Sequence, residues 1–353
     1  MRKMQKHIVK SNRICIGLED SKRTWKICVR CDRMIVHETS MPADYEILYS
    51  YLQNKFPDCQ IQIMYEAGFS GFWLHYSLQS DGIECIVTPA HKVTQPKVSK
   101  VKTDKVDARR LALNLESGDY SRCFVHDREL REDRQIIRTL NQIQNKITST
   151  KNQIRKFLDC HGLNKELAPG AWRSSHYASL KTMKLRKSLQ ICLHTYLDLL
   201  DYLLEVKDKL LEQLKELCKK EQYSKSVALK ESHPGIGWLT AIRFTLEWGD
   251  LSRFPSGKHF ASFTGLTASE HSSGEQIHRG RITCQGSGKV RSWLIQSAWR
   301  AIKLDPVLLH KYQSVWNNSG SKKKAIVAVA RKLAVRIRAV ELSGQPYAIG
   351  VIE

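Results

Sequence analysis

Two aspartates one helical turn apart are the residues of this chain best suited to chemistry. Asp104 and Asp107 lie in the segment KTDKVDARR, residues 102–110. On a helix, positions i and i+3 share a face, so the two carboxylates repel each other unless a cation lies between them. Mg²⁺ prefers such hard oxygen ligands. Thr103 is well placed to cap this helix. The alternative is that both aspartates only complement the helix dipole and pair with Lys or Arg.

Other acidic residues favour the metal-binding interpretation. Glu19 and Asp20 end the first predicted strand, and Glu66 ends the strand IQIMY. Carboxylates at the C-terminal ends of neighbouring strands, opposite an Asp-x-x-Asp helix, form a metal site of the ribonuclease H type. There, two ions clamp the attacking and leaving oxygens of a phosphodiester. We therefore predict a site for Mg²⁺, with Mn²⁺ as an alternative.

The elements that must position these acids follow from the N-terminal pattern. Residues 13–39 alternate between apolar and polar and predict three short strands. A helix with Pro42 near its start follows. Then come a strand over 61–65, a helix ending near Leu78 and a strand over 84–89. The order β-β-β-α-β-α-β predicts a three-layer α/β domain of about 115 residues.

The middle of the chain is predicted to be helical. A Lys/Arg-rich linker, 91–110, runs into the helix with the two aspartates, and a long polar helix is expected over about 127–158. Residues 180–220 then carry leucines at spacings of 3, 4 and 7, which predict either a helix packed within its own subunit or a coiled-coil dimerisation arm. These leucines are Leu193, Leu197, Leu200, Leu204, Leu211, Leu214 and Leu217.

The C-terminal third is rich in Gly and Ser, predicts short helices and ends in a basic amphipathic helix over 322–342. Its apolar face, which includes Ile326 and Leu333, is expected to be core. Its basic stripe is either a solvated face or a track for phosphates. Trp248, Trp293 and Trp299 are interpreted as core residues, with platforms for base stacking as the alternative. We predict three domains, with boundaries at 1–120, 121–225 and 226–353.

The charge of the chain indicates its partner. The 353 residues include 57 Lys+Arg and 35 Asp+Glu, a formal net charge of +22. Counterion release from phosphates makes nucleic acid the favoured partner, and an acidic membrane fits less well because the charge is spread along the whole chain. The absence of a long apolar run and of a signal-peptide pattern predicts a cytoplasmic protein that does not span a membrane.

Cys28 and Cys31 have the spacing of a zinc knuckle, but the sequence lacks a second pair. In a strand their side chains would point to opposite faces, which argues against a zinc site.

Five segments together resemble a known family, the DEDD-type insertion-sequence transposases, also called bridge recombinases. They are ICIGLEDSKRTWKICV, YEAGFSGFWLHYSLQSDGIECIVTPAHK, KTDKVDARRLA, HPGIGWLTAIRFTLEWGDLSRFPSGKHFASFTGLTASEHSSGE and RGRITCQGSGKVRSWLIQSAW. They cover about 13–115 and 226–340 in the family's order. The resemblance implies an α/β RuvC-like (ribonuclease H-like) N-terminal domain, a helical coiled-coil arm and a mostly helical C-terminal domain with a helix-hairpin-helix-like turn.

The resemblance also implies the roles of the acidic residues. The family's first metal-binding Asp falls on Glu19, so this chain departs from the pattern, and Asp20 is the substitute one residue on. Glu66 matches the second acid, and Asp104 and Asp107 match the final pair. An impaired metal site is the third alternative.

In the C-terminal domain the implied nucleophile is Ser273, with Ser272 as the adjacent alternative. A Ser hydroxyl is a weak nucleophile that needs a base or a metal nearby. The resemblance further implies a transient phosphoserine link to DNA, donor and target DNA as partners, and a structured non-coding RNA that selects them. A homodimer or homotetramer acting on the bacterial nucleoid is expected, because exchanging strands at two DNA sites needs several active sites.

Several residues are predicted to contact nucleic acid. The segment HPGIG resembles a helix-hairpin-helix turn, whose amides hold a phosphate without reading bases; alone, it is a tight turn before a helix. Basic residues elsewhere are candidate phosphate or RNA contacts, or else surface charge. The predicted contacts are Lys102, Arg109, Arg110, Gly235, Gly237, Arg279, Arg281, Lys289 and Arg291. The rival functions are a metal-dependent junction-resolving nuclease and an inactive nucleic-acid-binding relic.

Overall fold

The chain forms two compact units, Met1–Arg128 and Glu129–Glu353. The computed structural model describes residues 13–89, 103–163, 172–270 and 279–350. The helical arm and the C-terminal helices belong to the same unit, and the division into three domains stays a prediction. In the described ranges, no helix combines the length and the apolar character needed to span a membrane.

The N-terminal unit is built on a five-stranded sheet of order β3-β2-β1-β4-β5. β1 pairs antiparallel with β2 and parallel with β4, so a meander joins a parallel half. The predicted element order β-β-β-α-β-α-β is confirmed. The strands are β1 (Arg13–Asp20), β2 (Thr24–Cys31), β3 (Met34–Pro42), β4 (Gln60–Glu66) and β5 (Glu84–Thr88).

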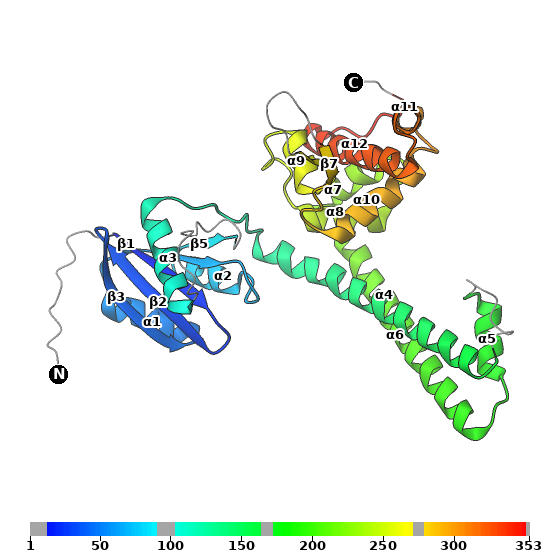
Figure 1. The fold of residues 1–353 in the computed structure, drawn as a ribbon, viewed down its shortest axis with the longest axis horizontal. Coiled ribbons are helices and arrows are strands. Elements are labelled where there is room, and N and C mark those ends of the chain that lie inside the picture. The colour runs from blue at the N-terminus through cyan, green and yellow to red at the C-terminus, as the bar shows by residue number, and fades with distance from the viewer. Residues whose placement is uncertain (1–12, 90–102, 164–171, 271–278, 351–353) are drawn as a thin grey trace. The chain divides into compact units, whose positions relative to one another are not determined.

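Helices cover both faces of this sheet, as the three-layer prediction requires (Figure 1). α1 (Tyr45–Lys55) and α2 (Trp73–Ser80) bury Leu48, Leu52 and Leu78 against one face. α3 (Asp104–Ser117) packs on the other face. The predicted helix near Pro42 is present but begins three residues later, at Tyr45. Pro42 itself ends β3, and the side chain of Asp44 caps α1 by accepting from two amides.

The arm is a pair of long helices, α4 (Arg128–Cys160) and α6 (Lys187–Lys219), with α5 (Ser174–Thr182) near its end (Figure 1). Leu193, Leu197 and Leu200 of α6 pack with Ile147 and Ile154 of α4. The leucine face of α6 is therefore used within the chain, which is the first of the two alternatives for this repeat. The dimerisation arm stays a prediction.

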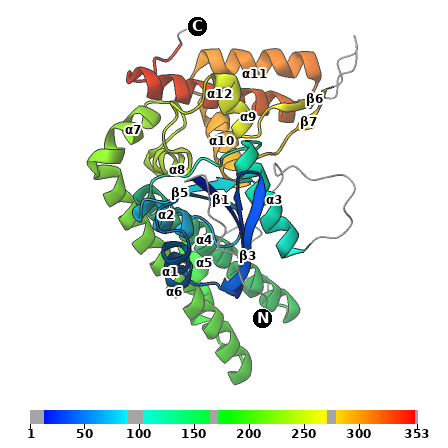
Figure 2. The same cartoon turned by 90° about the vertical axis from the view of Figure 1, so that its left-hand side faces the viewer.

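Among the described residues, six further helices and a short hairpin complete the second unit, in which α11 and α12 lie side by side (Figure 2). Ile326, Leu333 and Ile337 are buried, so the predicted apolar face of the last helix is core. The elements are α7 (Glu221–Glu231), α8 (Trp238–Trp248), α9 (Gly257–Phe263), β6 (Ala268–Glu270), β7 (Arg279–Ile282), α10 (Gly288–Ala301), α11 (Pro306–Ser319) and α12 (Lys322–Ser343). The hairpin β6–β7 was not predicted.

The predictions for tryptophans and cysteines are largely confirmed. Trp248 and Trp293 are buried, but Trp299 is 42% exposed, so the core interpretation of Trp299 is wrong. Cys28 packs with Ala108 and Ala112 of α3, whereas Cys31 belongs to the core on the other face of the sheet. The two sulfurs therefore point to opposite faces.

Candidate active site

The carboxyl ends of β1, β4 and β5 meet at one edge of the sheet. Gly17 of β1 pairs with Met64 of β4. Glu19 lies two residues after Gly17, and Glu66 lies two residues after Met64. Glu66 pairs in turn with Thr88 of β5. The parallel register thus brings Glu19 and Glu66 to the same level of adjacent strands, beside the hydroxyl of Thr88.

The alternation of side chains along these strands decides which face each acid occupies. Cys15, Met64 and Ile86 pack against α3, and successive residues of a strand point to opposite faces. Glu19 and Glu66 share the parity of these residues, so they lie on the face covered by α3. Both are partly exposed.

Asp20 lies on the opposite face. It shares the parity of Ile16 and Leu18, which belong to the core under α1 and α2. Asp20 is only 8% exposed, and its carboxylate accepts a hydrogen bond from the hydroxyl of Ser70. Burial raises the pKa of Asp20, against the opposing effect of the Ser70 bond. Asp20 therefore anchors the loop after β4.

The first turn of helix α3 carries the two aspartates of the candidate site, Asp104 and Asp107. Thr103 is its N-cap, as predicted, and its hydroxyl accepts a hydrogen bond from the amide of Val106 at 3.4 Å. Asp104 is exposed and accepts from the hydroxyl of Ser21 at 3.5 Å. Asp107 is 5% exposed and is ion-paired with Arg110 on the next turn.

Close packing holds α3 against β1. An ideal Cβ on Gly17 would lie 2.1 Å from the carbonyl oxygen of Ala108 and 2.3 Å from the amide nitrogen of Ala112. Only glycine permits this approach of helix and strand. The residue fixes the distance between the acids of the strands and the aspartates of α3.

The residue types at this edge fit a divalent cation, since carboxylate oxygens are the ligands that Mg²⁺ prefers. The hydroxyl of Thr88 adds a buried polar atom that has no hydrogen-bond partner among the described residues. Yet nowhere in the described ranges do three His, Cys, Asp or Glu side chains gather closely enough to hold a metal ion. The aspartates of α3 instead contact Ser21 and Arg110.

Two predicted nucleic-acid contacts of the N-terminal unit already have partners in the fold. Arg109 forms two hydrogen bonds with Glu38, one of them at 2.8 Å, and Lys105 lies 3.3 Å from the same carboxylate. Arg110 pairs with Asp107. Lys102 lies outside the described residues.

In the second unit, the segment HPGIG joins α7 to α8. Gly235 has a φ of +79°, and a Cβ there would lie 2.6 Å from the carbonyl oxygen of Ser297 on α10. Gly237 is the N-cap of α8, with extended backbone and open space around it. A turn thus joins two helices at this segment, and its helix-hairpin-helix character stays a prediction.

The remaining predicted residues lie around β7 and α10. Arg281 and Lys289 are exposed, whereas Arg291 donates to the carbonyls of Gln285 and Gly286 at 2.7 and 3.3 Å and so braces its own loop. Arg279 begins β7, which pairs antiparallel with β6. The predicted nucleophile, Ser273, and its alternative, Ser272, lie outside the described residues, between these two strands in the sequence.

Sequence reasoning missed Ser70 and Thr88. It included pairing of the aspartates with Lys or Arg as an alternative, but it did not name Arg110 as the partner of Asp107. The i, i+3 spacing of Asp107 and Arg110 was a visible signal for their ion pair. The hydroxyl groups gave no comparable signal, because their partners lie far away in the sequence.

Two family models match the chain in the same order as these structural parts. A transposase model of the DEDD IS110 type matches residues 16–162, and one described as the transposase IS116/IS110/IS902 family matches residues 228–313. They define a class of protein that moves insertion sequences. The chain belongs to the IS110/IS116 family of transposases.

Curated relatives carry the same assignment. The chain is 26% identical over 241 residues to y4qE of Sinorhizobium fredii and 29% identical over 309 residues to y4rJ of the same organism, both named as transposases. It is 27% identical over 282 residues to the transposase for insertion sequence element IS1111A of Coxiella burnetii. These matches cover 68%, 80% and 75% of this chain. The chain spans 58% of the length of y4qE, 76% of y4rJ and 73% of the Coxiella protein.

Proposed function

We propose that this protein cuts and rejoins DNA strands to move an insertion sequence, with a Mg²⁺-dependent acidic site and a serine nucleophile. The observation that carries the proposal is the register of β1 and β4, which brings Glu19 and Glu66 to one edge on the face covered by α3. Asp104 and Asp107 start that same helix.

Glu19, Glu66, Asp104 and Asp107 would hold the cation, with Mn²⁺ as a substitute for Mg²⁺. Side-chain parity supports Glu19 over Asp20, because Asp20 faces the opposite core. A bound divalent ion would stabilise the negative charge that develops on the phosphodiester. For Asp107 to take part, its carboxylate must leave or share its contact with Arg110.

The strand transfer needs no outside source of energy. The hydroxyl oxygen of Ser273 attacks a DNA phosphorus, the bond to one deoxyribose oxygen breaks, and that oxygen takes up a proton. A deoxyribose hydroxyl then attacks the phosphoserine and releases the serine. One phosphorus–oxygen bond forms for each that breaks.

The partners belong to the same proposal. Donor and target DNA are the substrates, and an RNA encoded by the element selects them through base pairing. Strand exchange at two sites calls for a homodimer or homotetramer, which would act on the nucleoid in the cytoplasm. The net charge of +22 supports a nucleic-acid partner without distinguishing DNA from RNA.

A covalent-trapping assay tests this function. The purified protein, RNA from the element's flank, labelled donor and target DNA and Mg²⁺ are mixed and run on a denaturing protein gel. We expect a labelled adduct that is lost in Ser273→Ala and Asp104→Ala and kept in Ser272→Ala. Cleavage without an adduct would support a metal-dependent, structure-specific nuclease instead. Binding without cleavage would support an inactive nucleic-acid-binding relic.

A further inference from the structure

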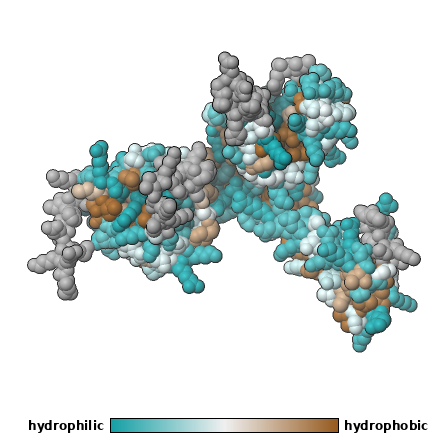
Figure 3. Space-filling view, in the orientation of Figure 1, coloured by the Kyte–Doolittle hydropathy of each residue, from teal (hydrophilic) through white to brown (hydrophobic). Residues whose placement is uncertain are grey.

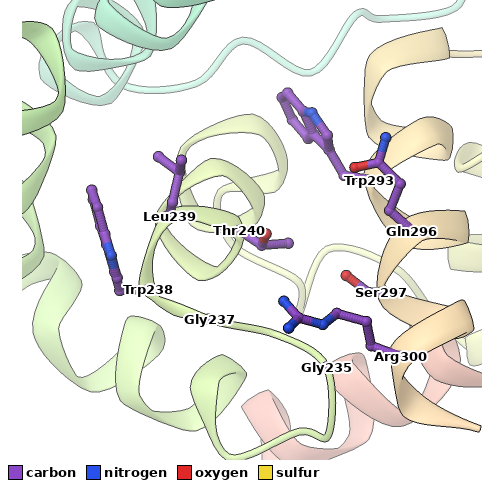
Figure 4. A pocket seen from close by; sticks show the side chains of 9 residues that line it. All are labelled: Gly235, Gly237, Trp238, Leu239, Thr240, Trp293, Gln296, Ser297 and Arg300. Atoms are coloured by element: carbon purple, nitrogen blue, oxygen red, sulfur yellow. The ribbon is translucent and has the colours of Figure 1, made fainter. Parts of the chain in front are cut away.

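A cavity of about 230 Å³ lies between the start of α8 and one face of α10 (Figure 4). From α10 it is lined by Trp293, Gln296, Ser297 and Arg300, which are spaced so that one face of the helix presents all four. From the other side, the turn at Gly237 and the first residues of α8 close it.

The cavity is suited to an anion. No Asp or Glu lines it, and the guanidinium of Arg300 points toward the turn at Gly237 (Figure 4). Arg300 is exposed, and its guanidinium forms no ion pair or hydrogen bond with any described residue. The positive end of the α8 dipole lies at the same place, where Gly237 offers no capping side chain.

Two further cations flank the tryptophans of the cavity. The ammonium of Lys215 lies 5.6 Å from the ring centroid of Trp238, and the guanidinium of Arg243 lies 5.0 Å from that of Trp293. Each of these cations covers one face of a tryptophan ring and adds positive charge near the cavity. The arrangement therefore favours an anionic group over an aromatic one.

A buried hydroxyl supplies an independent indication of a ligand. Ser297 is 3% exposed, and its hydroxyl points into the cavity (Figure 4). This hydroxyl forms no hydrogen bond with any part of the chain that the structure describes. A hydroxyl on a buried residue that faces a cavity and has no partner in the chain is well suited to donate to the oxygen of a ligand.

The two walls of the cavity, the turn before α8 and the helix α10, are in close contact at Gly235. The positive φ of Gly235 turns the chain toward α10, and its Cα approaches so closely that a Cβ would lie 2.9 Å from the Cβ of Arg300. Around Gly237, in contrast, no atom lies within 4 Å of an added Cβ. A backbone phosphate could therefore approach the first amides of α8 without obstruction.

We infer that this cavity binds one phosphate of a nucleic-acid backbone, with Arg300 pairing with its charge and Ser297 and the first amides of α8 donating hydrogen bonds. The inference rests on the proposed function only in taking nucleic acid as the partner. It extends the expected phosphate contact of the turn to Ser297 and Arg300 of α10, which are not among the contacts predicted from the sequence. The contact is independent of base sequence.

The test measures binding by the full chain in EDTA, so that the acidic site plays no part. Fluorescence anisotropy would follow labelled 30-mers of oligo(dT) and oligo(U) and a 30-bp DNA duplex as functions of salt. We expect Arg300→Gln to weaken binding of at least one probe about tenfold and to lower its salt slope by about 1. Ser297→Ala should weaken the same probe a few-fold with an unchanged slope. The probe affected identifies DNA or RNA as the source of the phosphate.

Lys303→Gln is the matched control, because Lys303 is an exposed cation just beyond the end of α10. It should change binding less than twofold. Equal losses in Arg300→Gln and Lys303→Gln, or no loss for any probe in Arg300→Gln, would overturn the inference. Thermal unfolding of each variant separates lost binding from lost folding. Failure of the proposed cutting activity would leave these results unaffected.

Discussion

The carboxylate of Asp107 is ion-paired with the guanidinium of Arg110, one turn further along α3. Both side chains are largely buried, with exposures of 6% and 13%. The most buried acid of the candidate metal site thus has its charge balanced by its own helix. A metal ion at this edge must compete with Arg110 for Asp107.

Removing that competitor should strengthen cation binding. We predict that Arg110→Ala binds Mn²⁺ about three- to tenfold more tightly than the unaltered protein, because a like charge beside the site is lost. Isothermal titration calorimetry measures the affinity. Arg109→Ala is the control, since Arg109 pairs with Glu38 and its loss leaves Asp107 unchanged. Unchanged or weaker Mn²⁺ binding by Arg110→Ala would contradict the proposed role of Asp107.

The close packing of α3 on Gly17 should not tolerate a side chain larger than hydrogen at this position. The methyl group of Gly17→Ala would overlap the backbone of α3, so we predict a loss of about 3 kcal/mol in the free energy of unfolding and loss of metal-dependent DNA cleavage. Urea unfolding measures the first and a cleavage assay the second. Cys15→Ala, on the same face of β1, should cost less and keep activity. A fully active Gly17→Ala would show that the spacing of strand and helix is not critical.

Much of the N-terminal unit could be predicted from its residues, because alternation and capping are local signals. Residues 13–39 alternate and form strands, and Thr103 caps α3. The same alternation could have separated Glu19 from Asp20, since Ile14, Ile16 and Leu18 share the parity of Asp20. What no local pattern gives is the partner of a side chain. The Ser70 bond to Asp20 joins residues 50 positions apart.

The buried imidazole of His233, at the turn before α8, should make stability depend on pH. His233 is 2% exposed and packs on the ring of Tyr347 at 4.6 Å between centroids. Burial lowers its pKa from 6.5 to about 4. Between these values the unfolded chain binds the proton and the folded chain does not, so the free energy of unfolding falls as pH falls, by at most about 3 kcal/mol.

We predict that His233→Asn shows a flatter dependence of the unfolding free energy between pH 7 and pH 4.5 than the unaltered protein. Urea unfolding at several pH values measures it, with His310→Asn, on the exposed side of α11, as the control. Parallel curves for His233→Asn and the unaltered protein would mean that the imidazole is protonated in the fold.

Substitutions on the buried and the exposed sides of α6 should have different effects, the first on the stability of the fold and the second on the association of subunits. Leu197 is 1% exposed in the arm's core, whereas Leu199 is 45% exposed and Tyr202 is 63% exposed on the outer side. Hydrophobic surface is visible on the arm in Figure 3. We predict that Leu197→Ala costs 2–4 kcal/mol of stability. Leu199→Asp should leave stability nearly unchanged and weaken the proposed oligomer.

Analytical ultracentrifugation and urea unfolding measure these two effects. An oligomer that resists Leu199→Asp combined with Tyr202→Lys would place the subunit contact elsewhere. The leucine spacing alone could not decide this question, because a seam packed on α4 and a seam packed on another subunit produce the same pattern. Only the tertiary contacts of Leu193 and Leu197 show where this face is used.

The C-terminal site was the least predictable part. The three-residue strand β6 has no alternation to detect, so the hairpin β6–β7 could not be foreseen. The spacing of Trp293, Gln296, Ser297 and Arg300 is visible in the sequence, but which helical face borders a cavity depends on the packing of α8 against α10.

The most direct test of the proposed acidic site is to ask which acid at the end of β1, Glu19 or Asp20, is needed for DNA cleavage. DNA strand cleavage would be measured against Mg²⁺ and Mn²⁺ concentration for Glu19→Gln and for Asp20→Asn, which keeps an oxygen for Ser70. We predict that Glu19→Gln reduces cleavage at least a hundredfold at unchanged DNA affinity, while Asp20→Asn keeps it within a few-fold. Cleavage that survives Glu19→Gln and is lost in Asp20→Asn would contradict the assignment of the acidic site to the α3 face of the sheet.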